Sequence, residues 1–144
     1  MEKIIVSRSI PQPFIDQLEA IAQVEMWDES LIPMPRDQFL EAIKDATACL
    51  ITLSEKIDSE VIKAAPNLKV IANMAVGFDN IDVPLVHSKG ITVTNTPGVL
   101  TETTAELGFT LMLTVARRIV EAEKYVQNGE WQSWGPYLFA GKDL

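Results

Sequence analysis

Cysteine is almost absent from this sequence of 144 residues, and its one cysteine, Cys49, lies in the apolar run 48–53. A single cysteine excludes an internal disulfide and cannot by itself form a cysteine-based zinc site. We therefore expect a reducing compartment, and we predict no metal ligand in the chain.

Basic residues are also scarce, since 12 Lys and Arg stand against 20 Asp and Glu and give a formal net charge of -8. The two signs are interspersed, so the average field repels nucleic acid and anionic membrane surfaces. Neither is an expected partner. A small anionic ligand would have to be held by local donors such as backbone N–H groups or an arginine.

Long hydrophobic runs are missing as well. The most apolar longer segment, 105–116, contains two threonines and ends before Arg117, well short of the ~20 residues that span a bilayer. Near the N-terminus only residues 4–6 are apolar, which is too short for a signal-peptide core. We expect a cytoplasmic protein.

What the chain does contain is a regular alternation of short apolar runs and helical patterns. Five runs rich in β-branched or apolar residues predict strands at 3–6, 24–27, 48–53, 68–74 and 91–94. Apolar residues at helical spacing separate the first four runs: Phe14, Leu18 and Ile21, then Phe39, Leu40 and Ile43, then Val61, Ile62, Ala64 and Ala65. Strands alternating with helices indicate an α/β fold with a parallel sheet covered on both faces.

Capping residues refine this organisation. Asp58 is predicted to cap the third helix, and Asp82 a short helix after the fourth strand. Thr103 and Glu106 have the spacing of a capping box for a helix running to about Gln127, which would be roughly 40 Å long. Because residues 105–116 are apolar almost all round, we expect this helix to meet a second domain or a second subunit.

In an open parallel sheet, ligands bind at the carboxyl ends of the strands. The loops there are 7–9, 53–56, 75–82 and 95–100, and the sequence contains neither a P-loop nor a G-x-G-x-x-G motif. In the loop 75–82, Gly77 allows a sharp turn or a close approach, so that the N–H groups of Val76 and Gly77 can form an anion-binding nest. A turn glycine with no ligand is the alternative. The sole histidine, His87, is expected on the surface.

The segments AVGFDNID at 75–82 and ITVTNTPGVLTETTAELGFTLML at 91–113 resemble the D-isomer-specific 2-hydroxyacid dehydrogenase family, and most closely its glyoxylate/hydroxypyruvate reductase branch. The resemblance covers nearly the whole chain. It implies a flavodoxin-like substrate-binding domain over residues 1–99. Residues 100–144 would then form a long interdomain and dimerisation helix and an aromatic segment that lead into a dinucleotide-binding domain.

By the same resemblance, a homodimer would reduce a small 2-oxo acid to a 2-hydroxy acid with NAD or NADP. The residues implied in binding are Val76 and Gly77 for the substrate carboxylate, Leu53 and Ser54 for the same pocket, Asn95 near the hinge, Val76 and Thr104 near the nicotinamide, and Trp134 inserted into the partner subunit's substrate pocket. Each has a simpler alternative: core packing for Leu53, a turn hydrogen bond for Asn95, helix capping for Thr104, and a plain dimer contact for Trp134.

No catalytic residue is expected in this chain. Hydride transfer to a carbonyl needs a proton donor and a cation, and the resemblance places a His–Glu pair and an Arg on the dinucleotide-binding domain. By this resemblance, the sequence ends where the family begins the strand that leads into its glycine fingerprint, so we expect the isolated chain to be inactive. A truncated, non-catalytic dimerisation or ligand-binding module is the alternative.

Overall fold

The computed structural model describes residues 2–143. The chain divides into two compact units, Met1–Gly98 and Val99–Leu144. The first unit contains β1 (Lys3–Val6), α1 (Gln12–Glu19), β2 (Gln23–Met26), α2 (Arg36–Ala42), η1 (Ile43–Asp45), β3 (Ala48–Ile51), α3 (Ser59–Ala64), β4 (Val70–Asn73), α4 (Val83–Ser88) and β5 (Thr92–Thr94). The second unit contains α5 (Thr101–Ala116) and α6 (Ile119–Gln127).

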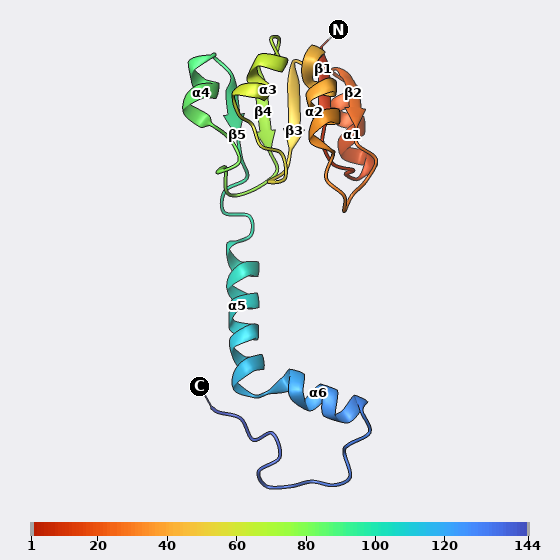
Figure 1. Cartoon of the computed structure of the whole chain (residues 1–144), viewed down its shortest axis with the longest axis vertical. Helices are drawn as coiled ribbons and strands as arrows, with labels where there is room; N and C mark the ends of the chain where they lie inside the picture. The colour runs from red at the N-terminus through yellow and green to blue at the C-terminus, as the bar shows by residue number, and fades with distance from the viewer. Residues whose placement is uncertain (1, 144) are drawn as a thin grey trace. The chain divides into compact units, whose positions relative to one another are not determined.

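The strands of the first unit form one sheet with the order β2-β1-β3-β4-β5, and all of its neighbouring pairs are parallel (Figure 1). Ile5, Cys49 and Ile71 lie side by side in register across its centre. This arrangement confirms the predicted five-stranded parallel α/β sheet. Two strands are shorter than predicted, because β3 ends before Thr52 and β4 begins only at Val70.

Helices cover both faces of the sheet, as predicted. On one face, Ile5 and Ile71 pack with Phe39 of α2, Val61 of α3 and Val86 of α4. On the other face, Ile4 and Val6 pack with residues from the region of α1, namely Ile15, Leu18 and Ala22. The apolar residues that predicted α1 are not all on its buried side. Phe14 is 57% and Ile21 75% exposed, whereas Ile15, which was not part of the pattern, is only 4% exposed.

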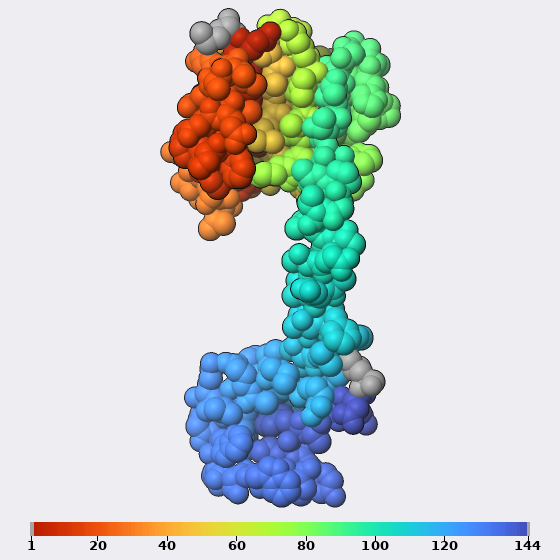
Figure 2. All heavy atoms as spheres, turned by 180° about the vertical axis from the view of Figure 1, so that it is seen from behind, coloured from red at the N-terminus to blue at the C-terminus, as the bar shows by residue number. Residues whose placement is uncertain are grey.

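The α1 face of the sheet is covered over only part of its width. Figure 2 looks onto this face, where the red and orange atoms of the N-terminal segments lie beside visible gold and green atoms of the later strands. Val70 of β4 is 37% exposed, and Thr92 and Thr94 of β5 are exposed. A parallel sheet is normally buried on both faces, so this strip is a surface that the first unit leaves open.

Two predicted helix caps are confirmed. The Asp58 carboxylate accepts hydrogen bonds from the N–H groups of Glu60 and Val61, and the Asp82 carboxylate accepts one from Leu85. Side-chain acceptors of this kind satisfy N–H groups that the helix itself leaves free. Both short helices therefore begin where the sequence predicted.

The predicted single helix to Gln127 is wrong, because the chain turns at Arg118, which has a left-handed φ of 55°. The Arg118 guanidinium pairs with Glu121 at 2.6 Å and lies 5.0 Å from the ring centre of Phe139. These contacts accompany a left-handed conformation that is uncommon for a residue other than glycine. The predicted capping box is also wrong: α5 begins at Thr101 with Leu100 as its N-cap, so Thr103 lies inside the helix.

No residue of α5 or α6 is buried. Leu107, Phe109 and Leu111 are each between 55% and 57% exposed. Among the described residues, no helix is both long and apolar enough to cross a membrane. The second unit thus displays the apolar helix that the sequence predicted would require a covering surface.

Candidate functional site

The carboxyl edge of the sheet gathers five of the residues that the resemblance singles out. Leu53 and Ser54 follow β3, Val76 and Gly77 follow β4, and Asn95 follows β5. The loops after β3 and β4 are neighbours, since Ile51 and Asn73 end these strands side by side. The edge therefore forms one continuous candidate site.

The loop after β4 carries two adjacent N–H groups, those of Val76 and Gly77, that have no acceptor among residues 2–143. The carbonyl of Ala75 accepts a hydrogen bond from Thr96 N–H at 2.9 Å, and the carbonyl of Val76 accepts one from Asn95 Nδ2 at 2.8 Å. A trans peptide is planar, with its C=O and N–H on opposite sides. Holding these two carbonyls therefore fixes the direction of the Val76 and Gly77 N–H groups.

Gly77 does not adopt a positive φ, so a left-handed turn is not what this glycine provides. A Cβ built on Gly77 would come no closer than 3.8 Å to a neighbour, the Asp79 carboxylate. The fold of this chain therefore does not require glycine here. What glycine provides is open access to two N–H donors, which suits an approaching anion.

A buried polar cluster lies beneath these loops and was not foreseen from the sequence. Glu55 is 5% exposed, and its Oε2 accepts hydrogen bonds from Ser7 Oγ at 2.8 Å, Thr52 N–H at 2.8 Å and Thr52 Oγ1 at 3.0 Å. These donors satisfy Oε2 of the buried carboxylate, whereas its other oxygen, Oε1, has no hydrogen-bond partner among residues 2–143. Glu55 thus joins the end of β1 to the loop that contains Leu53 and Ser54.

Arg8 is the second residue that sequence reasoning missed. Its guanidinium donates to Ser54 Oγ at 3.0 Å and to the carbonyl of Ser30 at 3.4 Å. Among the described residues no carboxylate lies within ion-pair distance of Arg8. This edge of an acidic protein therefore carries a cation whose charge no carboxylate neutralises.

The exposure and contacts of the predicted residues exclude several of their simpler structural roles. Leu53 is 61% exposed, so it is not a core residue, and Val76 is 43% exposed. The Asn95 amide holds the Val76 carbonyl and not its own turn. Thr104 is exposed within α5 and does not cap it.

Thr104 and Trp134 belong to the second unit. Trp134 is 78% exposed and lines a small apolar cavity of about 190 Å³ together with other aromatic and aliphatic residues, namely Tyr125, Val126, Trp131, Leu138 and Phe139. Tyr125 and Phe139 meet edge to face at 5.2 Å. The aromatic segment is therefore folded against α6, while the Trp134 side chain remains available to a further surface.

The site has no cysteine or histidine among the described residues. Burial, with a smaller contribution from Glu55, raises the pKa of the Cys49 thiol to about 12, so this thiol stays protonated and unreactive within the sheet. His87 is exposed on α4, as predicted. Residues 2–143 contain no cluster of three His, Cys, Asp or Glu residues that could hold a metal ion.

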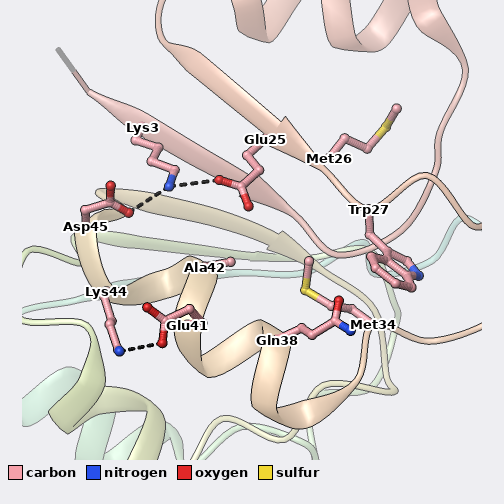
Figure 3. A pocket seen from close by; sticks show the side chains of 10 residues that line it. All are labelled: Lys3, Glu25, Met26, Trp27, Met34, Gln38, Glu41, Ala42, Lys44 and Asp45. Atoms are coloured by element: carbon pink, nitrogen blue, oxygen red, sulfur yellow. Dashed lines mark hydrogen bonds and ion pairs between the residues drawn. The ribbon is translucent and has the colours of Figure 1, made fainter.

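A wide hollow of about 650 Å³ lies elsewhere, between β2 and α2 (Figure 3). Its charged side chains neutralise one another: Lys3 contacts Glu25 at 2.9 Å and Asp45 at 2.7 Å, and Lys44 pairs with Glu41. Both lysines that line this hollow are therefore already paired with carboxylates, and neither is left as a free cation for an anion. The carboxyl edge remains the candidate site.

An open parallel sheet with free backbone donors at its carboxyl edge defines a ligand-binding α/β domain. The chain belongs to the D-isomer specific 2-hydroxyacid dehydrogenase family, because residues 4–133 match the profile of that family's catalytic domain. This match confirms the family resemblance that the loop and turn motifs carried.

Individual relatives agree with this membership. A glyoxylate reductase from Thermococcus litoralis is 44% identical over an alignment of 146 positions that covers 99% of this chain and 44% of the relative. The crystal structure of the TT0316 protein from Thermus thermophilus has a TM-score of 0.91 at 40% identity, covering 99% of this chain and 45% of that one. A D-lactate dehydrogenase from Aquifex aeolicus, complexed with NAD and lactic acid, has a TM-score of 0.73 at 26% identity, covering 93% and 39%. The chain thus spans less than half the length of these relatives.

Proposed function

We propose that this chain is the substrate-binding portion of an NAD(P)-dependent oxidoreductase that interconverts a small 2-oxo acid, such as glyoxylate or hydroxypyruvate, and its D-2-hydroxy acid. The observation that carries the proposal is the pair of free, oriented N–H groups of Val76 and Gly77. They bind the substrate carboxylate. Leu53 and Ser54 line the same pocket, and Asn95 orients the loop.

The residues of this chain fit the edge of a nicotinamide site and not a whole dinucleotide pocket. The sequence has no G-x-G-x-x-G loop, whereas Val76 and Thr104 are exposed and accessible to a ring edge. When bound, NAD or NADP supplies the hydride. This chain binds and orients the acid, and the proton donor and the cation that polarises the carbonyl lie on the dinucleotide-binding domain.

Titration of the ¹⁵N-labelled 144-residue chain with glyoxylate tests the binding role. We expect the amide signals of Val76 and Gly77 to shift in a saturable way. The Gly77→Ala variant should keep the wild-type spectrum elsewhere, since its Cβ meets nothing closer than 3.8 Å, and should weaken binding at least tenfold by blocking access to the donors. Unshifted signals of Val76 and Gly77 in the wild-type chain would refute the proposal.

The isolated chain should not oxidise NADH or NADPH in the presence of glyoxylate or hydroxypyruvate. The competing proposal is a non-catalytic dimerisation or ligand-binding module, and the exposed apolar side chains of α5, such as Leu107 and Leu111, favour a dimerising role. The intact mass of the protein from its native cells separates the two. A longer chain that carries the glycine fingerprint supports the oxidoreductase, and a native chain ending at Leu144 supports the module.

We further propose that the protein is a homodimer that uses α5, and that Trp134 of one protomer contacts the substrate pocket of the other. Exposed Leu107 and Leu111 make α5 a suitable contact surface. A Leu107→Glu/Leu111→Glu variant should sediment as a monomer. The control Leu31→Glu changes a residue of the first unit that is 89% exposed. It should sediment with the same oligomeric mass as the wild-type protein. A wild-type chain that is monomeric at every concentration contradicts this part of the proposal.

A further inference from the structure

One side chain, Asn80, connects the two loops of the carboxyl edge. Its Nδ2 donates to the carbonyl of Thr52 at 3.1 Å and to that of Glu55 at 3.0 Å, while its Oδ1 accepts from Asn73 Nδ2 at 3.2 Å. The first two contacts lie on either side of Leu53 and Ser54. Asn80 therefore closes the loop after β3 and reaches the end of β4 at the same time.

Asn73 carries the connection into the anion-binding loop. Its side chain is part of a residue that is only 2% exposed, and its Nδ2 donates a second hydrogen bond, at 2.9 Å, to the carbonyl of Gly77. That carbonyl shares a planar peptide unit with the N–H of Phe78. Fixing it fixes the far end of the loop, just as Asn95 fixes the unit between Val76 and Gly77.

The connection extends to the end of β1. Glu55, whose carbonyl accepts from Asn80, gathers Ser7 Oγ and both donors of Thr52 on one carboxylate oxygen. Hydrogen bonds in a poorly solvated interior are strong, and breaking one leaves its partner unsatisfied. The chain of hydrogen bonds thus runs from Ser7 at the end of β1 to the carbonyl of Gly77, by way of Glu55, Thr52, Asn80 and Asn73.

We infer that Asn80 is a positioning residue of the anion-binding site. It holds the two carbonyls of the loop after β3 on one side and Asn73 on the other. In this way it sets the distance between that loop and the N–H donors of Val76 and Gly77. This inference rests on the proposed function. Asn80 itself does not touch the substrate. Its contribution is that the donors are already aligned before the carboxylate arrives, so binding requires little reordering.

The test compares Asn80→Asp with Asn67→Asp in the ¹⁵N-labelled chain titrated with glyoxylate. The first change keeps the shape of the side chain and removes the amide donor. The second adds the same charge at exposed Asn67, which precedes β4 at the opposite end of the sheet. We expect Asn80→Asp to raise the dissociation constant for glyoxylate at least tenfold and to move the Gly77 and Phe78 amide signals without ligand. Asn67→Asp should change neither.

The outcomes distinguish this inference from the proposed function. If the wild-type chain binds glyoxylate at Val76 and Gly77 and Asn80→Asp binds equally well, Asn80 has only a structural role and the inference is wrong. If the wild-type chain does not bind, the proposed function itself fails. Should Asn80→Asp not fold, the neutral Asn80→Ala variant replaces it, and an unchanged dissociation constant in that variant overturns the inference.

Discussion

In the first unit, Ile5, Phe39 and Ile71 are each no more than 1% exposed, whereas in the second unit Phe109 and Leu111 of α5 are each more than half exposed. Both segments are rich in apolar residues, so composition alone does not distinguish them. The difference lies in what surrounds each residue. The sheet unit supplies its own covering helices, and α5 has no second layer within its unit, so the first unit can fold as an independent core while the second depends on another surface.

The largest effect is expected when one phenylalanine in each unit is replaced by alanine. Phe39→Ala removes a ring that is 1% exposed and should lower the free energy of unfolding by about 3–5 kcal/mol. Phe109→Ala removes a ring that is 57% exposed and should cost less than about 0.5 kcal/mol. Urea denaturation followed by circular dichroism at low protein concentration measures both. Equal losses would mean that α5 is buried within a single chain.

A smaller effect is expected from the charged contacts of the two units. The Arg36 guanidinium, helped by the N–H groups of α3, lowers the pKa of Asp58 below its usual value, and Arg118 similarly lowers that of Glu121. Asp58 also caps a packed helix, and Asp58→Ala should cost about 1 kcal/mol at pH 7. Glu121→Gln, on an exposed helix, should leave the free energy of unfolding unchanged.

The pH dependence follows from the sign of the Asp58 shift. Since the folded protein binds the Asp58 proton less readily than the unfolded chain does, the stabilisation is complete above the unfolded pKa, about 3.9, and is lost as the pH falls through the lower folded value. The difference between wild type and Asp58→Ala should therefore narrow below about pH 4. A difference that stays constant down to about pH 2 would show that the Asp58 charge contributes nothing.

The smallest expected effect is a change in the rate at which the Cys49 thiol reacts with a reagent. Burial in the sheet raises the pKa of this thiol to about 12, so at pH 8 only about one molecule in ten thousand carries the reactive thiolate. Reaction with a thiol reagent should be slow in the native protein and should accelerate in Phe39→Ala, but not in Phe109→Ala. Rapid reaction in the wild type would indicate that the centre of the sheet opens locally.

Much of the sheet unit could be predicted because its signals are local. Short apolar runs predicted all five strands, and Asp58 and Asp82 marked helix starts correctly. The errors arose where distant contacts decide the backbone. The turn at Arg118 is accompanied by contacts with Phe139 and by a hydrogen bond from Lys142 N–H to the Ala116 carbonyl, and nothing near Arg118 in the sequence signals either.

The candidate site shows the same division. Val76 and Gly77 were singled out from the sequence because a glycine after a strand marks a possible ligand loop. Glu55, Asn73 and Asn80 were missed, because each is an ordinary polar residue in the sequence and becomes a connected group only when β1, β3 and β4 align. A polar residue at the end of an otherwise apolar strand, as Asn73 is, was the one available signal.

The planar peptides of residues 75–77 affect how fast the proposed binding loop would take up a ligand. Their carbonyls are held by Thr96, Asn95 and Asn73 as soon as the sheet has formed. The conformational entropy of the loop is therefore lost during folding and not at each encounter with a ligand. Association should accordingly be limited by diffusion into the site, with no slow step of loop closure. Any substitution that loosens one of these three contacts would add such a step, and would make binding strongly dependent on temperature while the fold itself persists.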